Sequence, residues 1–491
     1  MQITKTLTRK LGLWSTISIV AGSVIGASIF MKPAIMASQL GSPVLLLGVW
    51  IFAGLISILG ASINAEIGAM LPVTGGQYVF FQKMYGSFFA YIYGWACFSV
   101  INTASVASIA YIFSQYSEYF FTFPRFDATL EKSFFISLPF IGRLFPLENI
   151  GVKTVTITIV LMLTLINSRS VKAGGAVQLF FSLAKVTALL LMIGLIFFSG
   201  KGSTENFFTG GTVPSLHGMS LVGGVVAALA GAFAAYDGWN NVGFVAGEIK
   251  NPAKNIPRAL FIGLGICILL YILTNQAYLY MLPVDVMATS NLVATDALQP
   301  VLGSGGAGMI ALLVMVSAFG ATNGNLLACA RVTFAMAKDG SFFKRISKVN
   351  HKHETPANAL WLHAVVTSLY VFTGSFDMLT DLFVFITWIF YGFGAAGVFI
   401  LRKKMPKADR PYRTAGYPLL PAIFVLFAAF YFVLTLYVDI TNYLDGKTQF
   451  ISSVFGLALT ATGIPFYFYF KKKGRLENTE RPKHNPGKSV G

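Results

Sequence analysis

Long apolar stretches, separated by short polar connections, run through almost the whole chain. Twelve of them approach or exceed the roughly 20 residues that a helix needs to cross the hydrocarbon core of a bilayer. The pattern therefore predicts an all-α integral membrane protein with twelve transmembrane helices. The stretches cover about residues 13–38, 44–70, 88–120, 150–167, 176–199, 219–247, 258–281, 306–337, 358–374, 380–401, 418–439 and 449–470.

The composition agrees with a lipid environment. Of the 491 residues, 55% are hydrophobic and only 11% are charged, whereas a soluble globular protein carries about 25% charged residues. The net charge of +17 raises the alternative of nucleic-acid binding, which requires basic residues gathered on one compact face. Here they lie mostly in short loops between apolar stretches. We therefore expect contact with a lipid bilayer and no nucleic-acid partner.

The basic residues also predict the orientation of the chain. With the N-terminus inside, most of the lysines and arginines fall on the inner side, including the clusters Arg402-Lys403-Lys404 and Lys471-Lys472-Lys473. Cytoplasmic loops are enriched in these residues, so both termini are expected in the cytoplasm, with residues 1–12 as the N-terminal segment and 471–491 as a basic tail. The Phe-rich outer loop 121–149 is expected to hold a short helix on the membrane surface.

Two of the apolar stretches are interrupted at mid-depth in the same style. The first contains Gly22-Ser23-Val24-Ile25-Gly26-Ala27-Ser28, and the sixth contains Ala234-Ala235-Tyr236-Asp237-Gly238-Trp239-Asn240-Asn241 after Gly231. Corresponding interruptions in two halves of a chain are the best sequence pointer to a transporter's binding site. They divide the chain into a first five-helix unit at 13–199, a second at 219–401 and two further helices at 418–470.

The interruptions suggest a ligand class. Unwinding a helix in the membrane exposes backbone groups that lipid cannot satisfy. The N-terminal end of an outer half-helix suits a carboxylate, and the carbonyls that end an inner half-helix suit an ammonium group. The pair therefore predicts a socket for a zwitterion. The alternative is that the glycines only allow close helix packing, but a matched pair favours a site.

Three ionisable residues stand well inside the stretches: Glu66, Lys185 and Asp237. Each is costly at that depth and is a functional candidate by default. Lys185 lies about 14 Å from the inner end of its stretch, too far to reach the interface, so it needs polar partners such as the carbonyls of a broken helix. It is a candidate proton acceptor or a fixed cation, and the alternative is a structural tether. Structural roles are expected for Asp237, as a cap, and for Glu66, as a holder of the inner loop.

Other chemistry finds little support. Cys97, Cys267 and Cys329 lie in apolar stretches as small hydrophobes, and the five histidines lie in loops or near helix ends. Without a deep cluster of His, Asp and Glu, we expect no enzyme, no metal and no cofactor. The sequence 303–308 matches G-x-G-x-x-G, but no strand precedes it, so it is expected to be a flexible outer loop. A sensor or a channel remains a further alternative.

The interrupted helices carry a family resemblance. The chain resembles, over about residues 10–420, the amino acid–polyamine–organocation (APC) superfamily and within it the L-type amino acid transporter branch. The motifs are Gly26-Ala27-Ser28-Ile29-Phe30, Ala65-Glu66 with Pro72–Tyr78, Tyr236–Asn241 with Glu248–Pro252 and Asn255–Ala259, Phe319-Gly320 with Asn323-Gly324 and Arg331, and Arg410–Arg413 with Gly416-Tyr417-Pro418.

The resemblance implies a five-plus-five inverted repeat, the LeuT-like fold, with two additional helices. It also implies sodium-independent exchange of L-amino acids across the plasma membrane by alternating access. Lys185 would link helices one, five and eight in place of a sodium ion, and Asn325 would face it. The resulting substrate-binding candidates are Ile25, Gly26, Ala27, Ser28, Ala234, Ala235, Tyr236, Gly238 and Asn240.

Two departures from the family pattern affect these expectations. Ser28 replaces the second glycine of the first interruption, and Ala234 stands where relatives often have an aromatic gate, with Phe233 facing elsewhere on its helix.

Animal relatives join a glycoprotein subunit through a cysteine in the loop after span three, but residues 121–149 contain none, so no disulfide-linked partner is implied. Neutral amino acids are the expected substrates, because the binding region has no acidic cluster that would bind a dibasic amino acid. Proton-coupled symport is the alternative transport mode.

Overall fold

The computed structural model describes residues 9, 11–71, 76–169, 171–209, 218–349 and 355–480, with the backbone alone for 171–184, 244–245 and 474–480. Within these ranges nine helical segments are long and apolar enough to cross a membrane. Shorter apolar helices include Leu13–Val24 and Ala357–Thr373, and a third shorter segment is Lys185–Phe198. The protein is therefore a largely helical, multi-pass membrane protein.

Helical segments occur at all twelve predicted stretches. Their bounds are α1 (Leu13–Val24), η1 (Ala27–Phe30), α2 (Lys32–Leu40), α3 (Pro43–Met70), α4 (Gly76–Tyr85), α5 (Ser87–Ala96), η2 (Cys97–Ile101), α6 (Asn102–Ser117), α7 (Ala128–Ser133), α8 (Ile150–Arg169), α9 (Val171–Ser199), η3 (Thr204–Phe207), α10 (Met219–Tyr236), η4 (Trp239–Glu248), α11 (Pro252–Met281), α12 (Val284–Thr289), α13 (Val293–Lys338), η5 (Lys344–Ser347), α14 (Ala357–Thr373), α15 (Phe376–Lys404), α16 (Leu419–Leu444), α17 (Ser452–Ala461) and α18 (Gly463–Glu480).

Local sequence explains where several helices begin and end. Gly41 adopts a left-handed conformation (φ 60°) that ends α2, as glycine does after many helices. The hydroxyl of Ser42 then accepts a hydrogen bond from the backbone N–H of Leu45 (3.4 Å), and Pro43 occupies the first turn of α3. Both are preferred helix-start residues. The chain therefore reverses direction between α2 and α3 within a few residues.

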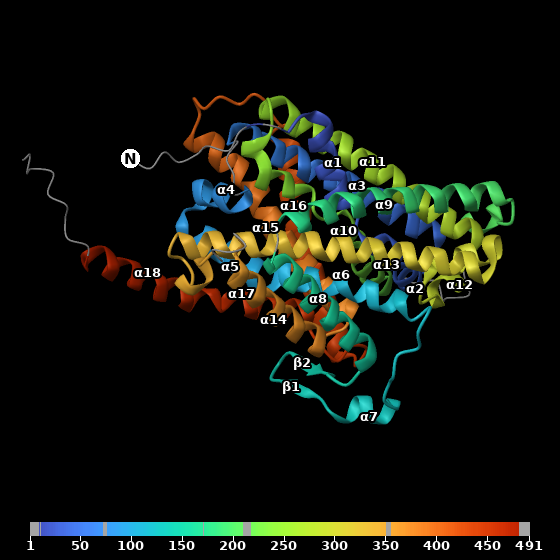
Figure 1. Ribbon diagram of the computed structural model, residues 1–491. Coiled ribbons are helices and arrows are strands. Elements are labelled where there is room, and N and C mark those ends of the chain that lie inside the picture. Colours follow the sequence, from blue (N-terminus) through green and yellow to red (C-terminus); the bar gives the residue numbers. More distant parts are fainter. Residues whose placement is uncertain are drawn as a thin grey trace, which may run out of the picture.

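The two broken helices lie inside the bundle. α1 packs along α11, α10 packs against α2 and α3, and α13 packs against α6 and α9. Figure 1 shows α10 near the middle of the molecule, with α4 and α18 toward one end and α2 and α12 toward the other. Segments from both halves of the chain therefore surround the interruptions.

One end of the bundle carries the basic cluster. α15 ends there, with Arg402 bound to Glu66 near the end of α3 and Lys404 bound to the carbonyl of Met84 at the end of α4 (2.9 Å). α13 also ends there, since Met336 packs with Tyr91 of α5. We call this the basic end. The opposite end, where α15 begins, is called the hairpin end after the pair of strands at 136–138 and 142–144 that lies there.

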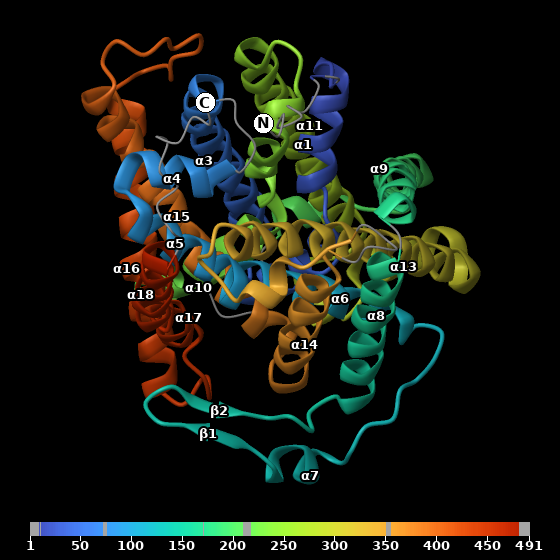
Figure 2. The ribbon, with the colours of Figure 1, turned by 60° about the vertical axis from the view of Figure 1, so that its left-hand side comes forward.

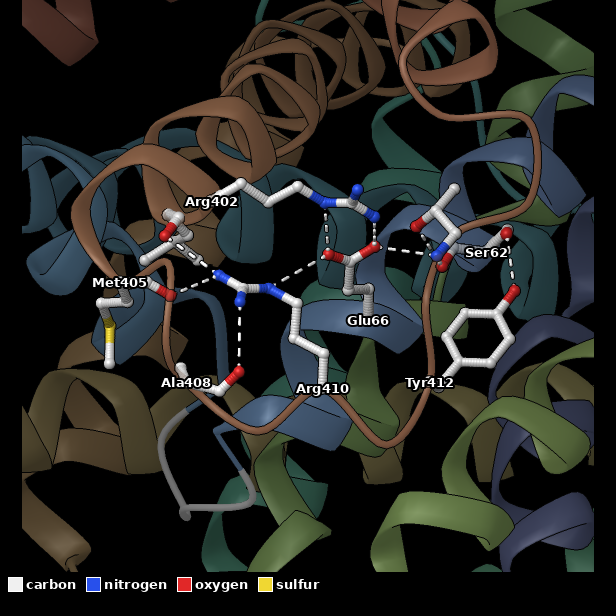
Figure 3. A network of polar contacts seen from close by, with 9 residues as sticks. Ser62, Glu66, Arg402, Met405, Ala408, Arg410 and Tyr412 are labelled. Atoms are coloured by element: carbon white, nitrogen blue, oxygen red, sulfur yellow. Dashed lines mark hydrogen bonds and ion pairs between the residues drawn. The ribbon is translucent and has the colours of Figure 1, made fainter.

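Glu66 is the centre of a polar network at the basic end (Figure 3). Its carboxylate accepts hydrogen bonds from Arg402 Nε (2.9 Å) and Nη2 (2.8 Å), and from the backbone N–H of Thr414 (2.8 Å). Arg410 Nε lies 3.6 Å away. A single buried carboxylate thus joins α3 and α15 to the 405–418 connection that precedes α16. Within the described chain, this connection is the loop that Glu66 contacts.

Two expectations need correction. The outer loop contains the short helix α7, but also an antiparallel pair of strands, β1 (Ile136–Leu138) and β2 (Gly142–Leu144), so the fold is not purely α-helical. Figure 2 shows this hairpin and α7 together beyond the ends of α8 and α14. Residues 303–308 are not a flexible loop, because α13 runs through them with a kink at Gly303 (φ 67°).

Candidate functional site

The first interruption leaves backbone groups of α1 without helical partners. α1 ends at Val24, Ile25 leaves the helical conformation, and Gly26 is extended before η1 begins. The backbone N–H of Gly26 donates to the Tyr271 hydroxyl (3.4 Å) instead of to the carbonyl of Gly22. That carbonyl is therefore available to another donor.

The second interruption requires glycine for two reasons. α10 ends at Tyr236, Asp237 is extended, and Gly238 has a φ of 104°, which glycine adopts without strain. A Cβ atom at Gly238 would also lie 2.7 Å from the carbonyl oxygen of Ser23. The two interruptions therefore touch through backbone, as a pair of crossed broken helices predicts.

Tyr271 of α11 connects the two interruptions. Its hydroxyl lies within hydrogen-bonding distance of the carbonyl oxygens of Val24 (2.9 Å) and Ala235 (3.1 Å), besides accepting from Gly26. It is fully buried. Sequence reasoning missed this residue, because a tyrosine inside an apolar helix gives no signal that distinguishes a backbone clamp from core packing.

A cavity of about 350 Å³ lies at the interruptions, within the usual size range of small-molecule sites. α6, α13 and α15 contribute further walls. Eight of the residues predicted for the site or for structural roles beside it line this cavity: Gly26, Ser28, Ala234, Gly238, Asn240, Lys185, Asn325 and Asp237.

Four substrate-binding candidates do not line this cavity, and neither does Glu66, which lies in the network at the basic end. The side chains of Ile25, Ala27, Ala235 and Tyr236 are buried, and Tyr236 packs its ring against Trp50 and Tyr271. From these positions only backbone groups at the interruptions remain available to a ligand. Their predicted role in substrate binding therefore concerns backbone rather than side chains.

Lys185 reaches the first interruption from α9. Its Nζ donates to the carbonyl oxygen of Gly22 at 2.5 Å, and the residue is only 3% exposed. This is the carbonyl that lost its helical partner at the break. The expectation that the buried lysine finds a carbonyl of a broken helix is thus confirmed.

Asn325 and Asp237 have local partners at the cavity wall. Asn325 Nδ2 donates to the carbonyl of Ala321 one turn earlier in α13 (3.0 Å). Asp237 accepts from the Tyr391 hydroxyl of α15 (2.5 Å) and interacts with the backbone N–H of Gly238. The Asp237 contacts agree with its predicted capping role.

The cavity is closed toward the hairpin end by packed aromatic rings. Phe233 is buried and packs on Trp388 (centroids 3.9 Å apart) and Tyr431 rather than lining the cavity. The expectation that Phe233 faces away is thus confirmed. The hydroxyl of Tyr116 in α6 also donates to the carbonyl of Phe30 (2.6 Å). This hydrogen bond connects the end of η1 to α6.

An ion pair between a buried lysine and an exposed aspartate reinforces this closure. Lys32 of α2 bonds Asp377 of α15 at 2.7 Å, with the lysine side chain 3% exposed and the aspartate 53% exposed. Sequence reasoning missed Lys32 although it lies within the first apolar stretch. A lysine near the end of a stretch resembles an interfacial residue, and only tertiary packing buries it.

No group of three or more His, Cys, Asp or Glu in the described part of the chain is arranged to hold a metal ion. His363, which was expected near a helix end, is buried in α14 between Thr333 (2.8 Å) and Thr103 (3.5 Å). Hydrogen bonds to two threonines thus hold His363 between helices, and it does not line the cavity.

Comparison with known proteins agrees with this geometry. The chain matches the amino acid permease family over residues 11–460. It is 30% identical over 430 residues to the b(0,+)-type amino acid transporter 1 of Homo sapiens, covering 87% of this chain and 82% of the relative. It is 29% identical over 469 residues to the cystine/glutamate transporter of Homo sapiens (94% and 85%).

A third relative gives the same result. The large neutral amino acids transporter small subunit 2 of Mus musculus is 31% identical over 485 residues, covering 96% of this chain and 83% of the relative. These matches confirm the resemblance that the interruption motifs indicated. The chain therefore belongs to the amino acid permease family, in its branch of L-type amino acid transporters.

Proposed function

We propose that the protein exchanges neutral L-amino acids across the plasma membrane without sodium, by alternating access to the cavity between the interruptions. Exposed backbone groups on both sides of each break offer partners for the carboxylate and ammonium groups of an amino acid. The named relatives are amino acid transporters, which supports the same substrate class.

The contact of Lys185 with the carbonyl of Gly22 carries the proposal of sodium independence. Carbonyls at the end of an inner half-helix are the groups that coordinate a sodium ion in broken-helix transporters. Here an ammonium group already occupies one of them at 2.5 Å. A fixed cation at this position removes the need for a mobile one.

We also propose twelve membrane spans in the LeuT-like arrangement, with units at 13–199 and 219–401 followed by two helices at 418–470. The positions of α1–α2 and α10–η4 support the matched pair of broken helices. The basic end, with Arg402, Lys403 and Lys404, is assigned to the cytoplasm by the positive-inside rule. Both termini are then cytoplasmic.

The carboxylates of the cavity support neutral rather than dibasic substrates. Asp237 is the one carboxylate among the lining residues and already accepts from Tyr391. A second, side-chain ammonium group on the substrate would therefore find no free carboxylate on the described walls. We further propose that the protein works without a disulfide-linked subunit, since its three cysteines are all buried in helices.

Labelled amino-acid uptake into proteoliposomes, without sodium, tests this function. We expect uptake into vesicles loaded with unlabelled amino acid, and little uptake into empty vesicles. Competition by other amino acids then defines the substrates. Uptake into empty vesicles driven by an inward proton gradient would instead establish the alternative of proton symport, in which Lys185 would titrate. Uptake that requires sodium would contradict both transport modes.

A further inference from the structure

Arg331 lies at the mouth of the cavity. The residues of α13 that line the cavity are spaced by about one helical turn and so share one face of the helix: Ala321, Gly324, Asn325, Leu327, Ala328 and Arg331. Arg331 is the last of them toward the basic end, about 9 Å beyond Asn325 along the helix axis. The cavity thus extends from the interruptions toward this end of the bundle.

The opposite wall extends in the same direction. Ile19 and Gly22 of α1 line the cavity on the basic-end side of the interruption. The chain just before α1 lies near the start of α11, where the backbone N–H of Lys250 donates to the carbonyl of Leu11 (2.8 Å). Toward the hairpin end, Phe233, Trp388 and the pair Lys32–Asp377 close the bundle. The cavity therefore opens at the basic end, where Arg331 is exposed.

The charge of Arg331 is unpaired within the described chain. Three charged residues line the cavity: Lys185, Asp237 and Arg331. Lys185 is bound to Gly22 and Asp237 to Tyr391, whereas Arg331 makes no hydrogen bond or ion pair to any residue that the structure describes. A guanidinium group presents a planar fork of donors that fits a carboxylate.

We propose that Arg331 forms a carboxylate-binding subsite at the mouth, which captures the α-carboxylate of an amino acid entering from the basic end. This inference rests on the proposed transport function and extends it to a residue that acts before the substrate reaches the interruptions. The substrate meets a free positive charge at the mouth and then moves about two helical turns inward. Arg331 therefore governs loading at this end.

Tracer exchange at equal amino-acid concentrations inside and outside proteoliposomes tests the role of Arg331. Under this condition every transporter must load through its mouth, whichever way it is inserted. At about 10 mM salt, where the screening length is about 30 Å, Arg331→Gln should raise KM roughly three- to tenfold. The maximal rate should stay within about twofold, and Arg331→Lys should fall between the two proteins, since it keeps the charge without the fork.

Lys338 provides a matched control. It lies seven residues further along α13 and is also exposed, but it does not line the cavity. Lys338→Gln should leave KM unchanged, and about 1 M salt should remove most of the difference between Arg331→Gln and the parent protein. An unchanged KM for Arg331→Gln, an equal rise for Lys338→Gln or a loss of maximal rate alone would overturn the proposal.

Chemical modification separates this proposal from protein folding and from the transport function. In purified Arg331→Cys, an excess of amino acid should slow reaction of the new thiol with methanethiosulfonate ethylammonium, and the added charge should lower KM again. The parent protein, with its three buried cysteines, is the control. Protection without exchange would support the subsite and contradict the transporter function, whereas exchange without protection or charge rescue would overturn the subsite alone.

Discussion

At the scale of single residues, the environment of Lys185 follows from the helix break. The break directs the N–H of Gly26 to Tyr271 and leaves the carbonyl of Gly22 for the lysine. Removing the ammonium group would leave that buried carbonyl unsatisfied and empty the position of the fixed cation. A loss of this kind affects the interruption rather than the remaining helices.

Lys185→Ala should therefore reduce amino-acid exchange at least about tenfold, since hydrogen bonds to charged groups contribute about 1.5–3 kcal/mol. Membrane insertion and protein abundance should stay normal. The measurement is exchange per amount of reconstituted protein. Lys201→Ala, which removes an exposed lysine bound to the carbonyl of Pro300 (2.7 Å), is the control and should be close to the parent. Normal exchange by Lys185→Ala would exclude its mechanistic role.

Ser28 adds a side chain to the cavity wall at the first interruption. Ser28→Gly should enlarge the pocket and shift preference toward bulkier amino acids by roughly three- to tenfold, in line with the effect of small volume changes in binding pockets. The ratio of inhibition constants for phenylalanine and alanine measures this shift. Ser38→Gly, at an exposed position of α2, should leave the ratio unchanged. Identical selectivity in both variants would place Ser28 outside the substrate pocket.

Sequence reasoning found those cavity-lining residues that are unusual in an apolar helix. Gly26, Gly238 and Lys185 stand out because a glycine cluster or a charge needs a reason at that depth. Tyr271 and Lys32 did not stand out, since the sequence does not say which helices become neighbours. Arg331 was quoted only as a family position, because nothing in a linear sequence shows that the cavity extends to it.

At the scale of helices and loops, the Glu66 network joins elements that are more than 330 residues apart in the chain. Glu66→Gln should lower the free energy of unfolding by about 2–4 kcal/mol, because it leaves Arg402 and Arg410 without their buried carboxylate. Arg402→Gln should be milder, since Glu66 keeps Arg410 and the N–H of Thr414.

Thermal unfolding of the purified protein measures the effect of these changes. Glu118→Gln is the matched control, because its side chain is 23% exposed and that of its partner Arg125 is 53% exposed, against 3% for Glu66, and ion pairs open to solvent contribute little. We expect the order of loss Glu66→Gln, Arg402→Gln, Glu118→Gln. Equal unfolding temperatures for the Glu66 and Glu118 variants would mean that the network does not hold these elements together.

Element positions were easier to predict than loop structure. Helix cores follow from long apolar runs, which membrane burial imposes. The β1–β2 hairpin had no such run. Its neighbours include the distant 449–451 segment, where the carbonyl of Gln449 accepts a hydrogen bond from the backbone N–H of Arg143 (2.8 Å). The glycine-rich segment 303–308 was predicted to be a loop but is a kinked helix, because glycine is tolerated within membrane helices.

At the scale of the whole molecule, one arrangement explains the cavity. The bundle is closed by aromatic packing and the Lys32–Asp377 pair at the hairpin end, and it opens beside Arg331 at the basic end. If the basic end is cytoplasmic, the structure corresponds to the inward-open state of an alternating-access cycle. The cavity between the interruptions is then the site that each side reaches in turn.

The most direct test of that central claim is an electron cryo-microscopy structure of the protein saturated with an amino acid that competes in the exchange assay. We expect density for the amino acid between the two interruptions, beside Gly26, Ser28 and Asn240, with Lys185 still bound to the carbonyl of Gly22. An amino acid bound elsewhere, with this cavity empty in a sample that exchanges normally, would contradict the account.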